Sequence, residues 1–124
     1  MAEFSRVPAI VVWVLQAVLA TAFLAAGGAK LAGVEQMVQT FDAIGVGQWF
    51  RYVTAVVEIA SGAALLLPGY AAVGAVLLVC TMVGAVITHL FVIGGSAVPA
   101  LVLLVLAALV LWLRRGQLAA VLGR

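Results

Sequence analysis

The chain has 124 residues, of which 68% are hydrophobic and 8% are charged, and its formal net charge at neutral pH is +2. Its mean hydropathy of +1.37 is far above that of soluble globular chains, so we expect a single domain, residues 1–124, that lies in lipid. The basic residues are scattered and form no patch, which argues against nucleic-acid binding.

Four apolar segments predict membrane-spanning helices. A hydrocarbon core about 30 Å thick needs roughly 20 apolar residues to cross it, and backbone groups in lipid must be paired within the helix. The first segment is too long for the apolar core of a signal peptide, so we interpret it as a retained helix. The sequence therefore predicts an all-α membrane four-helix bundle with spans at about 8–29, 50–67, 70–92 and 97–113.

The connections between the later spans are short. Pro68-Gly69 joins the second span to the third, and Gly94-Gly95-Ser96 joins the third to the fourth. Links of this length make consecutive helices antiparallel neighbours.

The distribution of basic residues predicts the orientation in the membrane. Four spans bring both termini to one side, and the positive-inside rule assigns the side richer in Lys and Arg to the cytoplasm. The side of the termini carries Arg6, Arg114, Arg115 and Arg124, and the opposite side carries Lys30 and Arg51. We therefore expect cytoplasmic termini and describe the opposite side as outer.

The one long connection, between the first two spans, has a helical pattern over 34–44. Its apolar residues follow helical spacing: Val34, Met37, Val38, Phe41 and Ile44. This periodicity predicts a short interfacial amphipathic helix on the outer surface. Two roles are open for it, a stiff connector or a lid over a pocket in the outer leaflet.

Glu58 is the residue that most suggests a function. It lies within an apolar run, and no other formally charged side chain occurs from Ile59 to Leu113. Because a carboxylate is costly in hydrocarbon, an intramembrane Glu is the first place to look for a functional site.

The predicted topology brings Glu58 to a depth similar to that of two other polar residues. With a rise of about 1.5 Å per residue, Glu58 lies roughly 10 Å and His89 roughly 6 Å inside the outer ends of their spans. Lys30 ends the first span on the same side. On the second span, helical spacing adds Arg51, Thr54 and Ser61 to the face of Glu58.

These residues form the candidate ligand-binding set: Lys30, Glu58, His89, Arg51, Thr54 and Ser61. A carboxylate, a cation and an imidazole at one depth suit the binding of a polar ring or head group, or a proton relay. The alternative is structural, in which Lys30 and Glu58 pair to fix helix packing and His89 is a hydrogen-bonded packing residue.

Other kinds of chemistry are not expected from this sequence. The chain has one Cys and one His, so it offers no disulfide, no C-x-x-C redox pair and no metal-ligand set. We interpret Cys80, deep in the third span, as a small core residue. Hydrolase, kinase and phosphate-loop motifs are absent, so no residue is assigned as catalytic and enzymatic activity stays uncertain.

Several segments together resemble a known family. They are Gly27-Gly28-Ala29-Lys30-Leu31-Ala32-Gly33, Phe41 with Ile44-Gly45, Val57-Glu58-Ile59, Gly62-Ala63, Leu65-Leu66-Leu67-Pro68, Gly84-Ala85 and Thr88-His89. In their order and spacing they resemble the DoxX-like family of small bacterial membrane proteins, over nearly the whole chain.

The resemblance implies a four-helix bundle in the bacterial inner membrane. Some members look like small subunits of thiosulfate:quinone oxidoreductase, and others are linked to redox-stress complexes. The resemblance matches Lys30, Glu58 and His89 to recurrent polar positions of the family. The lack of a cysteine pair argues against a thiol-oxidoreductase role.

Three functions follow as hypotheses. The preferred one is an accessory or binding subunit whose outer pocket takes a quinone-like or lipid-like molecule, with redox chemistry supplied by an oxidoreductase partner. A proton-coupled transporter of the small multidrug type also fits four spans with one membrane carboxylate, although Lys30 would repel cationic drugs. The third is an assembly or stability factor without a ligand. A homo-oligomer is compatible with all three.

Overall fold

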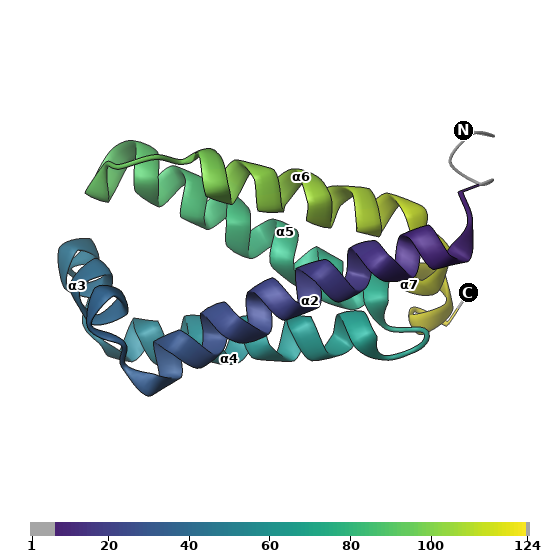
Figure 1. Ribbon diagram of the computed structural model, residues 1–124, viewed down its shortest axis with the longest axis horizontal. Helices are drawn as coiled ribbons and strands as arrows, with labels where there is room; N and C mark the ends of the chain where they lie inside the picture. The colour runs from purple at the N-terminus through teal and green to yellow at the C-terminus, as the bar shows by residue number, and fades with distance from the viewer. Residues whose placement is uncertain (1–6, 124) are drawn as a thin grey trace.

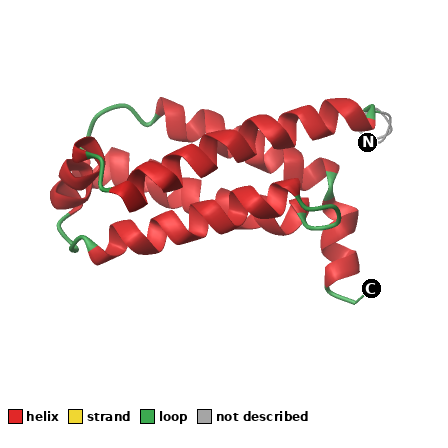
Figure 2. Cartoon of the chain, turned by 60° about the horizontal axis from the view of Figure 1, so that its bottom comes forward, coloured by secondary structure: helices red, strands yellow, loops and turns green. Residues whose placement is uncertain are grey.

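The computed structural model describes residues 7–123, whose helices form two antiparallel hairpins (Figure 1). The first hairpin pairs α2 (Ala9–Ala32) with α4 (Trp49–Leu66). The second pairs α5 (Ala71–Thr88), extended by the π-helical turn η1 (His89–Ile93), with α6 (Val98–Leu113). The described residues contain no strand (Figure 2). The prediction of an all-α membrane helix bundle is confirmed.

The lengths of the helices support the predicted spans. Three segments, Ala9–Ala32, Trp49–Leu66 and Ala71–Ile93, are each long and apolar enough to cross a membrane. The fourth, α6, qualifies only together with α7 (Arg115–Val121), from which it is bent by 65°. The sequence did not predict α7, because Arg114 and Arg115 interrupt the apolar pattern that marked the end of the last span.

The connection between α2 and α4 is mostly helical. α2 continues three residues past the predicted boundary and ends at Gly33, whose left-handed φ of 71° suits a residue without a side chain. α3 (Glu35–Ile44) follows at once, in agreement with the predicted helix at 34–44. Its buried Phe41 packs edge-on against Phe50 of α4, with ring centroids 5.8 Å apart. The position of α3 on the membrane surface stays a prediction.

The two hairpins pack tightly in the half of the bundle near α7, which we call the terminal half. Here α5 approaches α4 so closely that a Cβ on Gly74 would lie 2.6 Å from the carbonyl oxygen of Ser61. Leu65, Leu78 and Val110 are fully buried at this end. In the half near α3 and η1, which we call the loop half, the two hairpins diverge (Figure 1).

The beginning of α2 and the short helix α7 lie at the same end of the bundle (Figure 1). This arrangement agrees with an even number of spans. Arg6 and Arg124, two of the four residues used for the orientation, lie outside the described residues. The cytoplasmic location of the termini and the inner membrane as the location of the protein stay predictions.

Candidate functional site

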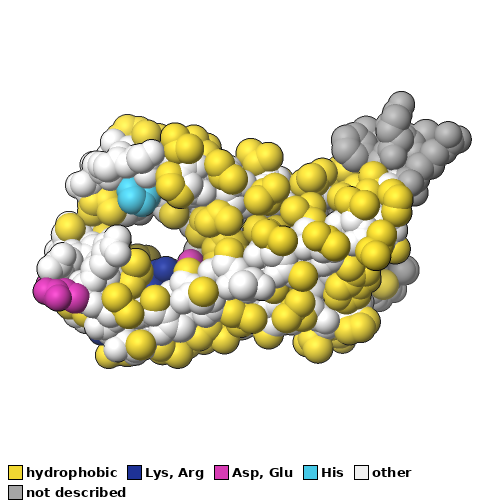
Figure 3. Space-filling view, in the orientation of Figure 1, with side chains coloured by type: hydrophobic (Ala, Val, Ile, Leu, Met, Phe, Trp, Pro, Cys, Tyr) yellow, Lys and Arg dark blue, Asp and Glu magenta, His cyan; other side chains and the backbone are white. Residues whose placement is uncertain are grey.

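The loop half contains a cavity of about 750 Å³, lined by residues of both hairpins and of α3. In a view across the long axis of the bundle, a hollow opens at this end, with basic and acidic side chains in its depth (Figure 3). The histidine of the chain lies at its rim. The hollow is therefore visible from the side of the bundle, which is the direction that faces hydrocarbon when the helices span a bilayer.

Lys30 and Glu58 form an ion pair on the wall of this cavity. Lys30 Nζ lies 2.8 Å from Glu58 Oε1, and the two side chains are 13% and 4% exposed. The pair forms because α2 and α4 approach closely one turn away: a Cβ on Gly27 would lie 2.6 Å from Ile59 Cγ1 and 3.0 Å from the carbonyl oxygen of Ala55. The structure thus brings two of the predicted site residues into direct contact.

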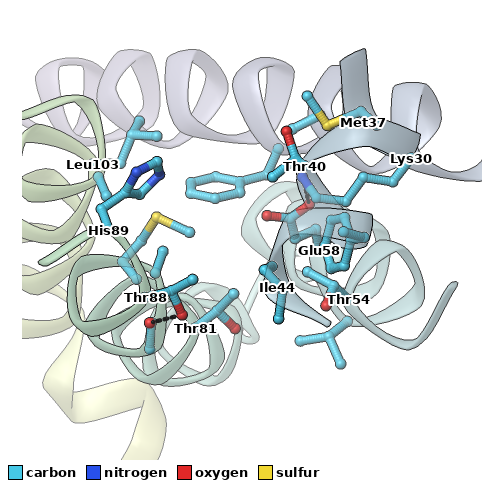
Figure 4. Close-up of a pocket in the computed structure, with 18 of the residues that line it drawn as sticks. Lys30, Met37, Thr40, Ile44, Thr54, Glu58, Thr81, Thr88, His89 and Leu103 are labelled. Atoms are coloured by element: carbon cyan, nitrogen blue, oxygen red, sulfur yellow. Dashed lines mark hydrogen bonds and ion pairs between the residues drawn. The ribbon is translucent and has the colours of Figure 1, made fainter. Parts of the chain in front are cut away.

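His89 lines the same cavity from the opposite hairpin (Figure 4). It begins the π-helical turn, a local widening of the helix that is frequent at functional sites. Its Nδ1 lies 2.9 Å from the carbonyl oxygen of Gly94. The imidazole lies on the wall opposite Glu58 (Figure 4), and the ion pair joins Lys30 and Glu58 without it.

The other three predicted residues are placed differently. Thr54 lines the cavity, and its hydroxyl donates to the carbonyl oxygen of Phe50, 2.9 Å away. Ser61 is fully buried and donates to the carbonyl oxygen of Val57, 2.6 Å away, so it serves its own helix. Neither Ser61 nor Arg51 is among the residues that line the cavity.

Arg51 closes the end of α2. Arg51 is 5% exposed, and its guanidinium donates to the carbonyl oxygen of Lys30 in the last turn of α2, which also accepts from the Gly33 N–H at 3.3 Å. It also donates to Gln48 Oε1 at 2.6 Å and to the Tyr52 hydroxyl at 3.2 Å. Arg51 thus fixes the position of the α2 end, and with it Lys30, relative to α4.

Sequence reasoning missed a second polar cluster, in the terminal half. Gln16 is fully buried; its Nε2 donates to the carbonyl oxygen of Leu65 at 2.7 Å, and its Oε1 accepts from Arg114 Nε at 2.7 Å. The signal was present in the sequence, since Gln16 is the only amide side chain in the first apolar segment. The cluster ties the first hairpin to the end of α6.

Further wall residues were also missed. Three threonines, Thr40, Thr81 and Thr88, line the cavity together with Thr54. The interpretation of Cys80 as a core residue is wrong: its side chain is exposed and lies on the cavity wall, because the hairpins diverge at this level. Periodicity within one helix does not reveal how far two helices separate.

The chemistry of the wall is that of a binding site for an amphiphile. Most of the lining is apolar, and the polar groups are the ion pair, one imidazole, one amide and the threonine hydroxyls. No group of three or more His, Cys, Asp or Glu residues able to hold a metal ion occurs within residues 7–123. A volume of this size lies within the range of about 300–1,000 Å³ typical of small-molecule sites.

A family model matches most of the chain. The model of the DoxX-like family matches residues 14–113, which include α4, α5, α6, all but the first five residues of α2, and every residue of the candidate set. No curated protein and no solved structure matches the chain at a significant level. Because the family model covers well over half of the sequence, the chain belongs to the DoxX-like family.

Proposed function

We propose that this protein is an accessory membrane subunit that binds a quinone-like or lipid-like amphiphile in the loop-half cavity. The observation that carries the proposal is a cavity of about 750 Å³ with a buried ion pair on its wall. A pair that only fixed helix packing would be equally effective between tightly packed helices. Here Glu58 lies on the surface of an open space, where a ligand can reach its carboxylate.

The lateral opening supports access from the bilayer. A lipid-soluble molecule partitions into hydrocarbon, and the hollow is open in that direction (Figure 3). The polar end of the ligand would lie between Glu58 and His89, and its apolar part along the walls of α5 and α6. α3 covers the adjacent end of the bundle, and through Phe41, Met37 and Ile44 it contributes apolar residues to the wall. α3 would thus act as the gate.

The packed terminal half supports binding rather than passage through the protein. Gln16 and Arg114 close the space between the first hairpin and α6 at that end. Redox chemistry would be supplied by a partner oxidoreductase, consistent with the quinone-linked chemistry that the family resemblance implies. The bound molecule would then be a substrate held for that partner.

The test is a thermal-shift measurement on purified protein with ubiquinone and menaquinone analogues and a panel of phospholipids. We expect a saturable rise in Tm with at least one quinone analogue, and loss of that rise in Glu58→Gln. Ser61→Ala is the matched control, because Ser61 is a buried polar residue of the same helix that lies off the cavity wall. If no member of the panel shifts the Tm, the proposed function is wrong.

A further inference from the structure

The polar groups of the cavity wall are mostly hydrogen-bond acceptors. Each of its threonine hydroxyls donates its single proton to the carbonyl oxygen four residues earlier in its own helix. These bonds are Thr40 to Gln36, 2.8 Å; Thr54 to Phe50, 2.9 Å; Thr81 to Leu77, 2.7 Å; and Thr88 to Gly84, 2.8 Å. The hydroxyls therefore keep only lone pairs for a ligand.

The imidazole of His89 is also an acceptor. The Gly94 carbonyl oxygen can only accept, so Nδ1, 2.9 Å away, must carry the proton that joins them. In the neutral ring this leaves Nε2 without a proton. A ligand that pairs with Nε2 must bring a donor of its own.

The carboxylate of Glu58 is the strongest acceptor on the wall. It is 4% exposed, and among the described residues Lys30 alone holds it, at Oε1. A carboxylate offers about four lone-pair sites, so one ammonium leaves most of them unfilled, which is costly in a low-dielectric setting. The wall has fewer donors than acceptors: the two ammonium protons of Lys30 beyond the one that faces Glu58 Oε1, the amide of Gln36 and the weakly donating thiol of Cys80.

We infer that the cavity selects a head group that carries hydroxyl donors, and specifically a hydroquinone over the corresponding quinone. The inference rests on the proposed function and assigns the redox form that is bound. Glu58 and His89 line the cavity from opposite hairpins (Figure 4), so a head group with hydroxyls at both edges of its ring would meet one acceptor on each side. A quinone presents two carbonyl oxygens to the same two acceptors and satisfies neither.

The experiment compares three probes of nearly the same shape: decyl ubiquinol under anaerobic reducing conditions, decyl ubiquinone, and the di-O-methyl ether of the quinol. Dissociation constants are measured on the detergent-solubilised full chain. We expect the quinol to bind at least about tenfold more tightly than the quinone or the ether. The quinone and the ether have no hydroxyl group that could donate to the Glu58 carboxylate. Equal binding of the three, or tighter binding of the quinone, overturns the inference while leaving the proposed function intact.

A fourth probe distinguishes a hydroxyl group on a lipid from a hydroxyl group on a quinol ring. Diacylglycerol offers a hydroxyl on a lipid, and binding of diacylglycerol without binding of the quinol would overturn the assignment to a ring. If none of the probes binds, the inference fails together with the proposed function.

Two variants test whether His89 and Glu58 cause the preference for the quinol. His89→Phe keeps a ring at this position and removes the acceptor, so we expect the quinol to lose most of its advantage while quinone affinity is unchanged. Glu58→Gln removes the charged acceptor, so we expect both forms to bind more weakly and the quinol to lose more affinity than the quinone. Thr21→Val is the control, because Thr21 bonds to its own helix outside the cavity and should keep the wild-type ratio. An unchanged ratio in folded His89→Phe would contradict the role of the imidazole.

Discussion

The two halves of the bundle are built from the same four long helices but handle polar groups in opposite ways. In the terminal half, Gln16 bonds to Leu65 and Arg114, and helix contacts leave no room for a Cβ on Gly74. In the loop half, Glu58 and His89 line a cavity. Here the two hairpins, which pack together in the terminal half, diverge (Figure 1). Polar groups thus lock the first region and remain available in the second.

This difference suggests that the terminal half holds the helices in place and the loop half keeps the cavity open. A cavity of this size would favour collapse of its walls unless the helices were held elsewhere, because unfilled space forfeits dispersion contacts. The terminal half supplies that constraint. At the other end, Arg51 and Gln48 hold α2 and α3 without filling the space between the hairpins.

The largest effect should come from breaking the ion pair of the loop half. Lys30→Met leaves Glu58 buried without its cation, and we expect a loss of about 3 kcal/mol in the free energy of unfolding. The loss is measured by reversible denaturation in detergent. The double variant Lys30→Met/Glu58→Leu should recover much of this stability. If the double variant is less stable than the single one, the unpaired carboxylate is not the cause.

A second test removes the close contact of the terminal half. Gly74→Ala places a methyl group 2.6 Å from a carbonyl oxygen of the backbone, which cannot move aside easily. We expect a loss of about 2 kcal/mol, seen as a lower Tm. Gly84→Ala is the matched control: it lies in the same helix with nothing within 4 Å of its Cβ position, and should be neutral or stabilising. Equal effects of the two variants would contradict the contrast in packing.

A third change tests the polar lock of the terminal half. Gln16→Leu leaves the Leu65 carbonyl oxygen and the Arg114 guanidinium short of a partner, and we expect a loss of about 1–2 kcal/mol. Thr21→Val, on an exposed part of the same helix, should have little effect on the same chemical denaturation curve. A Gln16→Leu protein as stable as the wild type would show that apolar packing alone holds this end.

The smallest effect on global stability should come from loosening α3. Gln48 Nε2 donates to the Val38 carbonyl oxygen at 3.0 Å and to Asp42 Oδ1 at 2.8 Å, so it fastens α3 to the start of α4. In Gln48→Ala we expect less than about 1 kcal/mol of destabilisation, with faster amide hydrogen exchange confined to residues 35–44. Uniformly faster exchange in all helices would contradict a local gate.

Much of the bundle could be predicted from the sequence, because long apolar segments and short links leave few topologies for a chain in lipid. The predicted topology placed Lys30 and Glu58 at similar depth, and their pairing was one of the two alternatives left open. The cavity did not, because the separation of two hairpins depends on packing between helices that are distant in sequence. Gln16 and Arg114 are such a pair, and neither shows its partner in the local pattern.

The role of Arg51 shows the same limit. Helical spacing placed it correctly on the face of Glu58, and it is buried as expected. Spacing does not show which atoms the side chain contacts. The guanidinium of Arg51 donates to the Lys30 carbonyl oxygen at the end of α2. Sharing a face therefore predicted burial for Arg51 but not a place on the cavity wall.

The most direct test of the open loop half uses the native thiol. Cys80 lies on the cavity wall, and no engineering is needed to label it. The control is Leu77→Cys in a Cys80→Ala background, because Leu77 is exposed on the same helix but off the wall. We predict that a small maleimide labels Cys80 in folded protein and that decyl ubiquinol slows this reaction saturably while leaving Leu77→Cys unaffected. Labelling of Cys80 only after unfolding, or equal slowing at both positions, would contradict an open, ligand-accessible cavity.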